Sequence, residues 1–397
     1  MRTPRSKASL ARSRPSEAGT DAPFLRLALR LARRGFGTTA PNPMVGAVLV
    51  KRGQIIGQGW HRRAGGPHAE IEALRDCERR GHSPRGATLY VTLEPCCTHG
   101  RTPPCTDAIV AAGIRRVVAA AIDPNPRHAG RGFRLLRRAG TIVNVPGAAW
   151  AAEVARLNEA FNHWIVHRTP FVTVKAAMTL DGKIATASGE SKWITGEAAR
   201  RLGMKLRQGA DAILVGVNTI LADDPSLTVR LGAAKSGSAR ADLASCAPRL
   251  RRIVLDAQAR TPVRAKVVAD EWAHLSTIVV GRNAPASRVR ALSRRVRVWR
   301  APVRDGRIDL RWLLRRLGRE EVTHLLVEGG GEVNASFLLG GLAQRTAFFY
   351  APKVLGGRDA RKAVAGEGVG SLKRALPLRE LEWRRVGPDL FVTARVG

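Results

Sequence analysis

The chain has 397 residues, which is enough for two domains of ordinary size and excludes a peptide hormone or a lone small binding module. Lys and Arg number 67 and Asp and Glu 32, so the net charge is +35, although the charged fraction of 25% is ordinary. The basic residues are scattered along the chain and form no blocks, which favours a compositional bias over a nucleic-acid-binding patch. A basic surface would still attract phosphorylated substrates.

The apolar pattern and the cysteines predict the cellular setting. No apolar run reaches the 18 residues that a membrane-spanning helix needs, so we expect a soluble protein without a membrane partner. Five Cys in a long chain without a secretory signal indicate a reducing compartment, here the cytoplasm, and metal-binding or reactive thiols. Residues 1–22 are basic and rich in Ser and Pro, which predicts a disordered tail, with a transit peptide as the alternative.

Apolar runs of strand length alternate with helical periodicities, which predicts an α/β protein. In chain order we expect a helix at 24–34, strands at 45–50 and 55–59, a helix from 69, a strand at 88–93, a helix from 106, a strand at 116–121, a helix from 133, a strand near 141 and a helix at 148–161. Pro170 forces an extended break. The sequence therefore predicts a tail at 1–22 and two α/β domains at 23–167 and 168–397.

The second domain continues the alternation. We expect strands at 171–177, 211–215, 252–256, 277–281, 324–327, 346–350 and 391–394, and helices from 196, through 219 and from 332. Residues 231–248 are small and polar, which is typical of a surface loop.

Two segments of the first domain carry metal-binding residue types: PHAE, which ends at Glu70, and TLEPCCTHGRTPPC, which ends at Cys105. One imidazole from His68 and two thiolates from Cys96 and Cys105 would hold zinc and leave its fourth position open for water. Glu70 follows His68 by two residues and could exchange protons with that water. This is the arrangement of zinc deaminases, whose signature is H-x-E followed by P-C-x-x-C.

A structural zinc site is the alternative, since such sites close with four ligands. Cys97 could compete for the metal, and His99 could supply a fourth ligand. Only three ligands are in register, which favours a catalytic site. We therefore expect Cys97, like Cys77 and Cys246, to be a packing residue.

The spacing between the two cysteines departs from the short signature, because Cys105 follows Cys96 by nine positions. The segment EPCCTHGRTPPC resembles the longer zinc loop of the bifunctional riboflavin-biosynthesis deaminase/reductase (RibD) family. TAPNP with the following VG, GWH and DPNP resemble further segments of that family, and the resemblance extends from Phe24 to the C-terminus. It implies that the pyrimidine and its ribose phosphate are held by Asn42, His61, Arg101, Asp123 and Asn125.

No G-x-G-x-x-G follows a strand in the second domain, so a standard Rossmann dinucleotide site is not expected. Two other strands run through glycine into a helix, one at Gly329–Gly331 and one at Gly216. Backbone amides at a helix start can bind a pyrophosphate, and glycine allows its close approach. A run of three glycines is also common as a plain turn.

Three longer segments resemble the reductase half of the same family: FVTVKAAMTLDGKIATASGESKWITG, ILADDPSLTVR and LLVEGGG. The resemblance implies a dihydrofolate-reductase-like fold and contacts with NADPH by Ala177, Trp193, Thr219, Asp223, Gly329, Gly330 and Gly331. It implies substrate contacts by Ser191, Arg207, Leu227, Arg230 and Glu328. Lys175 is the expected proton donor, with a solvated surface lysine as the alternative. Asp223 and Asp224 could instead form only a helix end.

The resemblance implies a cytidine-deaminase-like zinc domain followed by a reductase domain, with one Zn²⁺ per chain and NADPH as cofactors. A diaminopyrimidinone carrying a ribosylamino phosphate would lose an amino group as ammonia, and NADPH would then reduce its ribosyl group to ribityl. The family also suggests a homo-oligomer. A tRNA-type nucleic-acid deaminase is the alternative enzyme, and a non-catalytic binding protein is the second alternative. The long zinc loop and the second domain disfavour a nucleic-acid partner.

Overall fold

The computed structural model describes residues 17–98, 103–230 and 250–397. Its contacts divide the chain into two compact units. Unit 1 contains the residues up to Gly35 together with Met44–Leu157, and unit 2 contains Phe36–Pro43 together with Asn158–Gly397. The division falls after Leu157, earlier than the boundary expected at 167/168.

Unit 1 is built around a five-stranded mixed sheet in the order β2-β1-β3-β4-β5. Its strands are β1 (Gly46–Lys51), β2 (Gln54–Trp60), β3 (Thr88–Val91), β4 (Arg116–Ala119) and β5 (Ile142–Asn144). β1 is antiparallel to β2 and β3, while β3, β4 and β5 are parallel. The parallel strands bring the loops after β3 and β4 to the same sheet edge.

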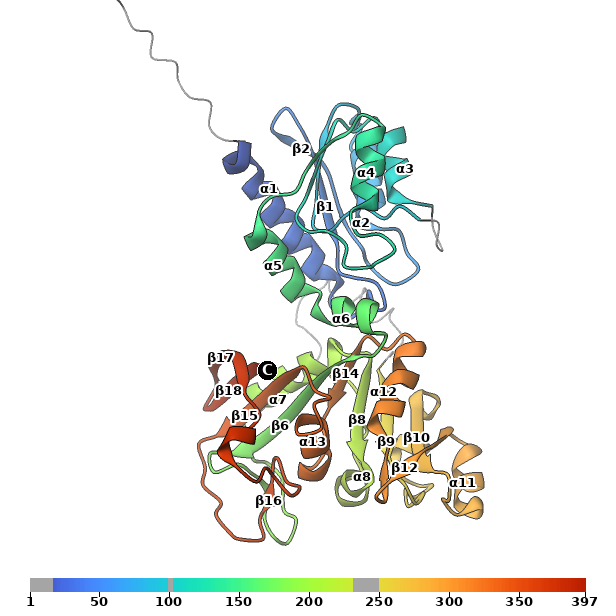
Figure 1. The fold of residues 1–397 in the computed structure, drawn as a ribbon, viewed down its shortest axis with the longest axis vertical. Coiled ribbons are helices and arrows are strands. Elements are labelled where there is room, and N and C mark those ends of the chain that lie inside the picture. The colour runs from blue at the N-terminus through green and yellow to red at the C-terminus, as the bar shows by residue number, and fades with distance from the viewer. Residues whose placement is uncertain (1–16, 99–102, 231–249) are drawn as a thin grey trace, which may run out of the picture. The chain divides into compact units, whose positions relative to one another are not determined.

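Helices cover both faces of this sheet (Figure 1). They are α1 (Glu17–Ala32), the 3₁₀ turn η1 (Arg33–Gly35), α2 (Ala69–Arg79), α3 (Cys105–Ala111), α4 (Arg131–Arg138) and α5 (Ala148–Leu157). Leu49 on β1 packs in one core with residues of α2, α3 and α4, whereas its neighbour Val48 packs in a second core with residues of α1 and α5. The alternation follows from the two-residue side-chain period of a strand.

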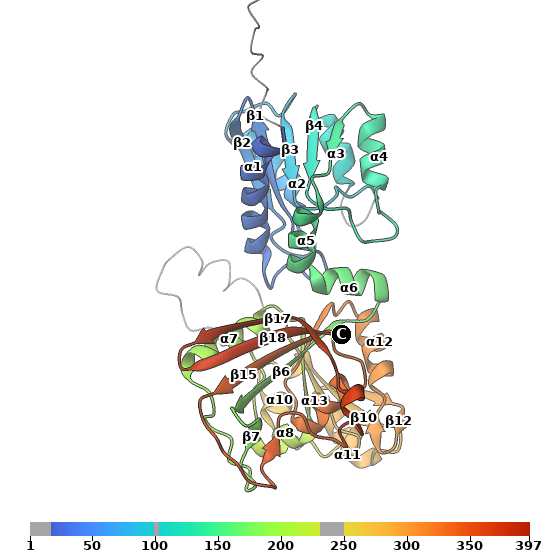
Figure 2. The same ribbon diagram turned by 60° about the vertical axis from the view of Figure 1, so that its left-hand side comes forward.

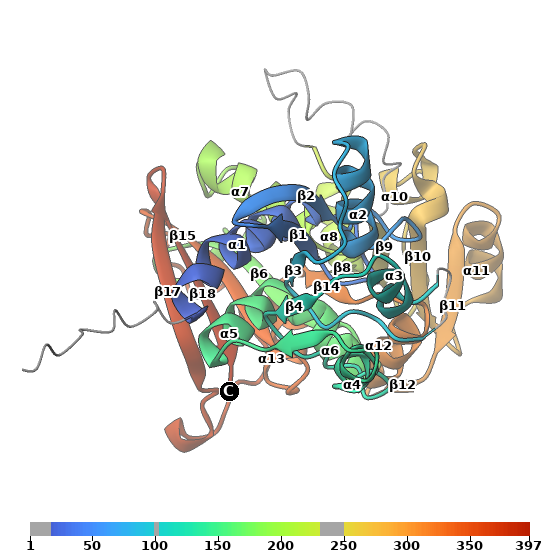
Figure 3. The same ribbon diagram turned by 90° about the horizontal axis from the view of Figure 1, so that it is seen from above.

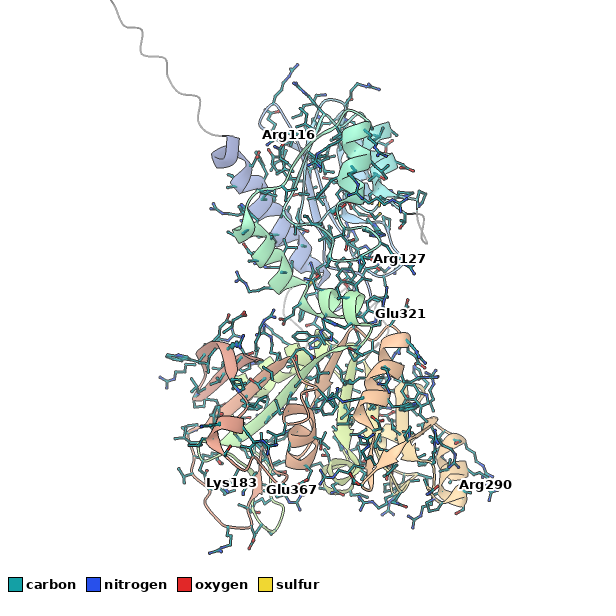
Figure 4. All side chains as sticks on the ribbon, in the orientation of Figure 1. Arg116, Arg127, Lys183, Arg290, Glu321 and Glu367 are labelled. Carbon is teal, nitrogen blue, oxygen red and sulfur yellow. The ribbon has the colours of Figure 1, made fainter. Side chains whose placement is uncertain are left out.

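The first helix begins at Glu17, so the disordered tail predicted for residues 1–22 overlaps it. Asp21 anchors this first helix to the sheet. Its buried carboxylate accepts hydrogen bonds from the Tyr90 hydroxyl at 2.7 Å and from Arg116, labelled in Figure 4, at 2.7 and 2.9 Å. Residues 1–16 lie outside the described residues.

Unit 2 contains a nine-stranded sheet in the order β11-β10-β9-β8-β14-β6-β15-β18-β17, with β17 and β11 at opposite ends (Figure 3). The strands from β11 to β15 in this order are parallel to one another. β18 is antiparallel to β15, and β17 is antiparallel to β18. The strands are β6 (Phe171–Thr179), β8 (Ala212–Gly216), β9 (Arg251–Leu255), β10 (Ser276–Gly281), β11 (Arg297–Ala301), β14 (His324–Val327), β15 (Arg345–Ala351), β17 (Leu378–Val386) and β18 (Asp389–Val396). Two short pairs accompany it: β12 (Val303–Arg304) with β13 (Arg307–Ile308), and β16 (Arg361–Lys362) with β7 (Lys183–Ala185).

The helices of unit 2 lie on both faces of the large sheet. They are α6 (Glu159–His167), α7 (Glu197–Gln208), α8 (Val217–Asp223), α10 (Lys266–Ala269), α11 (Ala286–Ser293), α12 (Leu310–Arg319) and α13 (Gly331–Leu338), with 3₁₀ turns η2 (Ala273–Leu275) and η3 (Leu372–Arg374). Ile213 on β8 packs in a core with residues of α8, α10 and α11, and the adjacent Leu214 packs in a core with residues of α12 and α13. Glycine-containing turns connect the ends of β8 and β14 to α8 and α13.

The helix expected at 148–161 is two helices, because Asn158 has a non-helical backbone and caps α6. The contacts of α6 explain the early unit boundary. The Trp164 indole donates to the Gly318 carbonyl at 2.9 Å, and Arg345 donates to Glu159 at 2.8 Å, all within unit 2.

The edge strand β17 has no counterpart in the sequence prediction, since nearly all of its residues are exposed. Figure 2 shows it at the edge of the sheet, next to β18. Within the described ranges, the helices lack the combination of length and apolar character that a membrane span requires.

Candidate functional site

Unit 1 brings together the three predicted metal ligands. The Nδ1 atom of His68 lies 3.5 Å from the Cys96 sulfur and 3.3 Å from the Cys105 sulfur. All three ligand atoms lie within 4.8 Å of one another. One imidazole and two thiolates converging in this way match the nitrogen and sulfur ligands that zinc prefers. The donor set therefore fits a zinc ion.

Three local structures place these ligands. His68 is the N-cap residue of α2, Cys105 is the first residue of α3, and Cys96 lies in the loop after β3. The backbone N–H of Cys105 donates to the Cys96 sulfur at 3.3 Å. The hydrogen bond of the Cys105 thiol, helped by those of His68 and this backbone N–H, outweighs burial and lowers the pKa of Cys96, which favours the thiolate that a metal binds.

Glu70 lies in the first turn of α2 with its side chain fully buried at the metal ligands. Burial raises its pKa to about 7, against the opposing effect of His68. A carboxyl group that titrates near neutrality beside a metal site has the property that a general acid/base needs.

The metal group contains none of the alternative ligands that the structure describes. Cys97 is not part of it, although it follows Cys96 directly. Burial raises the pKa of Cys97, which disfavours its thiolate. His99 lies outside the described residues, so the closed four-ligand site stays an open alternative at that position.

Of the five residues predicted to hold the pyrimidine, the structure describes all but Arg101. His61 lies beside His68, with 5.4 Å between ring centroids, and its Nδ1 lies 2.9 Å from the Pro67 carbonyl oxygen. Burial lowers the pKa of His61, so its neutral form is favoured. Asn42 lies in the 36–43 segment that groups with unit 2. Arg101 falls outside the described residues.

Asp123 and Asn125 lie in the loop after β4. One Asp123 oxygen accepts the Asn125 N–H at 2.8 Å, and the other lies 2.9 Å from His128 Nδ1. The Asn125 side-chain oxygen accepts the N–H of Arg127 at 3.1 Å; Arg127 is labelled in Figure 4. Both side chains thus shape this loop, and within the described ranges no hydrogen bond engages the NH₂ group of the Asn125 amide.

In unit 2 three predicted residues form one ion cluster. Glu328 directly follows β14 and accepts two hydrogen bonds from Arg207 on α7, each of 2.9 Å. Lys175 on the neighbouring strand β6 places its Nζ 3.5 Å from Glu328. Burial alone would raise the pKa of Glu328, but the charges of Lys175 and Arg207 outweigh it and lower the pKa to about 2. The cluster keeps a fixed carboxylate between two cations.

A cavity of about 780 Å³ lies next to the two glycine turns of unit 2. Five of the predicted residues line it: Ser191, Thr219, Asp223, Gly330 and Gly331. A Cβ added at Gly330 would meet no atom within 4 Å, whereas a Cβ at Gly331 would clash with the Lys362 carbonyl. The open space at Gly330 and the helix start beside it form a cradle for a phosphate group. The cavity therefore has a helix N-terminus and open space beside it at one of its walls.

The other predicted cofactor and substrate residues lie outside the lining of this cavity. Trp193 is 66% exposed, with the Arg200 guanidinium stacked 4.6 Å from its ring. Leu227 is buried with a positive φ of 52°, and Arg230 is exposed. Ala177 is on β6, and Gly329 lies between Glu328 and the cavity residue Gly330.

Sequence reasoning did not find several cavity residues. Four cations line it, namely Arg260, Arg307, Arg361 and Lys362. Arg260 donates to the Asn218 amide oxygen at 2.8 Å, and Arg307 pairs with Glu332 at 3.3 Å. The position of Arg260 after the parallel strand β9 was a usable signal, because ligands of parallel sheets bind at the carboxyl ends of the strands.

Two family models match the chain. The RibD C-terminal domain matches residues 170–392, and the cytidine and deoxycytidylate deaminase zinc-binding region matches residues 19–121. The two matches cover the reductase-like and the metal-binding parts in the expected order.

Curated relatives match nearly the whole chain. The riboflavin biosynthesis protein RibD of Actinobacillus pleuropneumoniae is 42% identical over 94% of this chain and 94% of its own length. The protein of the same name from Escherichia coli (strain K12) is 41% identical over 92% of this chain and 97% of its own length.

Solved structures of the same length also match. Acinetobacter baumannii RibD, form 2, has a TM-score of 0.82 at 33% identity and covers 96% of this chain and 100% of its own. A diaminohydroxyphosphoribosylaminopyrimidine deaminase/5-amino-6-(5-phosphoribosylamino)uracil reductase from Thermotoga maritima has a TM-score of 0.78 at 33% identity, with coverages of 96% and 100%.

These matches confirm the predicted fold class, a cytidine-deaminase-like zinc domain followed by a reductase domain of the dihydrofolate-reductase-like type. The predicted resemblance rests on the same segments that build the two sites above. The chain belongs to the RibD family of riboflavin biosynthesis proteins.

Proposed function

We propose that unit 1 deaminates a diaminopyrimidinone ribosylamino phosphate and that unit 2 reduces the ribosyl group of the product with NADPH. As a RibD protein the chain is a bifunctional deaminase and reductase of riboflavin biosynthesis. The observation that carries the proposal is that one chain holds both a three-ligand metal cluster with a buried Glu70 and a reductase unit with a Lys175–Glu328–Arg207 cluster.

In the deaminase site, His68, Cys96 and Cys105 would hold one zinc ion, which supplies Lewis-acid activation of water when bound. Glu70 takes a proton at its carboxylate and delivers it to the departing amino group, a role that its pKa of about 7 supports. His61 lies beside His68 and presents a neutral ring to the pyrimidine. Asn125, with its free NH₂ group, and Arg101 are the proposed contacts to the base and the phosphate, together with Asn42 and Asp123.

In the reductase site, Glu328 orients the two cations that flank it, and Arg207 and Lys175 bind the polar groups of the substrate. Lys175 is the proposed proton donor at the ribosyl group. Ser191, Leu227 and Arg230 are the further proposed substrate contacts. A fixed carboxylate that holds two cations in place gives the preorganised charges that stabilise a developing negative charge.

NADPH is the proposed cofactor of unit 2, where it would supply the hydride when bound. The cavity supports this, because four cations and two helix starts line it. Gly329–Gly331 and Thr219 would face the pyrophosphate, and Ala177, Trp193 and Asp223 are the other proposed contacts. The family also supports the proposal of a homo-oligomer. The cytoplasmic location stays a prediction.

The tRNA-deaminase alternative is disfavoured, because the reductase domain model matches residues 170–392. The substrate proposal can be tested by mass spectrometry of the reaction products. Without NADPH we expect a deaminated product that keeps its ribosyl group, and with NADPH the ribityl product. Deamination of adenosine in tRNA, without either product, would contradict the proposal.

A further inference from the structure

A chain of three side chains links two loops of unit 1. The Thr98 hydroxyl lies 2.8 Å from Nε2 of His128, and Nδ1 of the same ring lies 2.9 Å from the Asp123 carboxylate. Thr98 follows the metal ligand Cys96 by two residues, whereas Asp123 and His128 lie in the loop between β4 and α4. His128 thus joins the zinc loop to the loop that carries the proposed substrate residue Asn125.

The same two loops are joined on the other side of Cys96 by Glu94. Its buried carboxylate accepts the backbone N–H groups of Asp123 at 3.2 Å, of Gly130 at 2.8 Å and of Gly132 at 2.8 Å. Cys96 therefore lies between two attachment points. In the 123–133 loop, Glu94 is held by backbone N–H groups, which a substitution does not remove. Thr98 is held by the side chain of His128, so a substitution of His128 removes this second attachment alone.

The His128 ring can keep both hydrogen bonds in either protonation state. With one proton, Nδ1 donates to Asp123 and Nε2 accepts from the Thr98 hydroxyl. With two protons, both nitrogens donate, because a hydroxyl is both donor and acceptor. The Asp123 carboxylate, 2.9 Å from Nδ1, raises the pKa of His128. His128 can therefore connect Thr98 to Asp123 in both protonation states.

We propose that His128 is a positioning residue of the deaminase site, which sets the direction of the Cys96 thiolate and the place of Asn125 together. Partners that hydrogen-bond to metal ligands orient them, and their loss typically lowers metal affinity or activity by about 10- to 100-fold. His128 would act in the same way one residue further out, through the loop that carries Cys96. The inference rests on the proposed deaminase function of unit 1. Among the residues that the structure describes, His128 has no hydrogen bond to His68, Cys96 or Cys105, and it acts through Thr98 and Asp123.

The test uses the matched pair Thr98→Val and Thr98→Ser, with His128→Ala and the Thr98→Val/His128→Ala double variant. Serine keeps the hydroxyl, whereas valine keeps the shape and removes the hydrogen bond. For each protein we would measure zinc content, the rate of zinc loss to a chelator, kcat and KM for ammonia release, and the reductase rate on deaminated substrate. The reductase rate checks that unit 2 is intact, and the thermal unfolding of each variant checks the folding of unit 1.

We expect Thr98→Val and His128→Ala each to lower kcat for ammonia release by about tenfold or more and to speed zinc loss. Thr98→Ser should stay within about twofold of the wild type, and the reductase rate should be unchanged in every variant. Because both single changes cut one link, the double variant should be no slower than His128→Ala alone.

Two results would overturn the proposal. One is a Thr98→Val protein that matches Thr98→Ser in both ammonia release and zinc loss. The other is a double variant whose defect is the product of the two single defects, which would mean that the residues act independently. If the wild type releases no ammonia, the proposed function fails instead, and the difference in zinc loss between valine and serine at position 98 still decides the role of the link. If His128→Ala fails to fold, the Thr98 pair carries the test.

Discussion

The Nζ atom of Lys175 lies 3.5 Å from Oε2 of Glu328, and the strand register places them opposite each other at the meeting of β6 and β14. Val174 pairs with Val327 in this parallel pair, so the next residues, Lys175 and Glu328, lie side by side. Arg207 donates to both oxygens of the same carboxylate, each at 2.9 Å. Because the cluster is mostly buried, each of its charges depends on the other two.

Glu328→Gln should damage both the stability and the reductase reaction. It leaves Lys175 and Arg207 without their carboxylate, and breaking a buried pair typically costs about 3–5 kcal/mol. We expect a fall of about 3 kcal/mol in the free energy of unfolding of unit 2 and a large loss of NADPH oxidation, while ammonia release is kept. Chemical denaturation and both activity assays would measure this.

The matched control is Glu380→Gln. Glu380 pairs with Arg395 at 3.1 Å, but its side chain is 60% exposed, and exposed pairs contribute about 1 kcal/mol or less. An equal loss of stability in both variants would contradict the importance of the buried cluster.

Glu70→Gln should abolish ammonia release and leave the metal in place. The amide cannot carry the proton that the buried carboxyl group is proposed to move, and general acid–base groups contribute about 10²- to 10⁴-fold to rates. Zinc content should stay at the wild-type value. Glu72→Gln is the control, because Glu72 pairs with the exposed Arg62. Turnover retained by Glu70→Gln would refute its role.

Cys105→Ser should remove the metal, whereas Cys97→Ser should not. Cys105 belongs to the metal group and Cys97 does not. We expect metal analysis of the first variant to show lost zinc, with ammonia release gone and reductase activity kept on deaminated substrate. The adjacent Cys97 thiol serves as its control. Equal zinc loss in the two variants would show that the ligand set is assigned wrongly.

Four residues of the metal site could be predicted because the signal is local. His68 and Glu70 are two positions apart, and one short segment separates Cys96 from Cys105. These residue types close together in the sequence indicated a zinc site, and the long segment between the cysteines led to the family resemblance. Thr98 and His128 had no such signal, since 30 residues separate them and the parallel pairing of β3 and β4 brings their loops together. Arg260 was missed for the same reason, because only the strand order places the loop after β9 at the cavity.

The elements of the fold were also predictable where their signal was local in the sequence. Strands with buried, apolar sequences were predicted within a few residues, as for β6 and β14. The edge strand β17 was missed because its sequence, LRELEWRRV, is largely charged and its pairing with β18 defines it. The break at Asn158 within a helical composition was missed because the contacts of α6, such as Trp164 with Gly318, lie far away in the sequence.

Arg260→Gln should weaken the binding of NADPH more than that of NADH. Arg260 lines the cavity and donates to the neutral amide of Asn218, which leaves its charge for a phosphate. A hydrogen bond to a charged group is worth about 1.5–3 kcal/mol, so the dissociation constant for NADPH should rise about tenfold or more. Titration followed by fluorescence would measure it. Arg290→Gln on α11 is the control (Figure 4); the same weakening for NADH would exclude a role in phosphate recognition.

His163→Gln should reduce the acid sensitivity of unit 2. Burial, followed by the nearby His167, lowers the pKa of His163 to about 4 from its usual 6.5. Between these pH values the unfolded chain binds a proton that the folded chain does not, so stability falls as the pH falls from 6.5 to 4. The variant lacks this contribution, and its thermal midpoint should fall less over that range. The exposed His82→Gln should behave like the wild type; the reverse order would contradict the assignment.

The most direct test of two separate active sites in one chain is a single assay that follows ammonia release and NADPH oxidation together on the diaminopyrimidinone ribosylamino phosphate. We predict one ammonia and one NADPH per substrate. Chelation of zinc should stop the first signal and leave NADPH oxidation intact on substrate that is already deaminated. Loss of NADPH oxidation on deaminated substrate after chelation, or ammonia release that never leads to NADPH oxidation, would contradict the account.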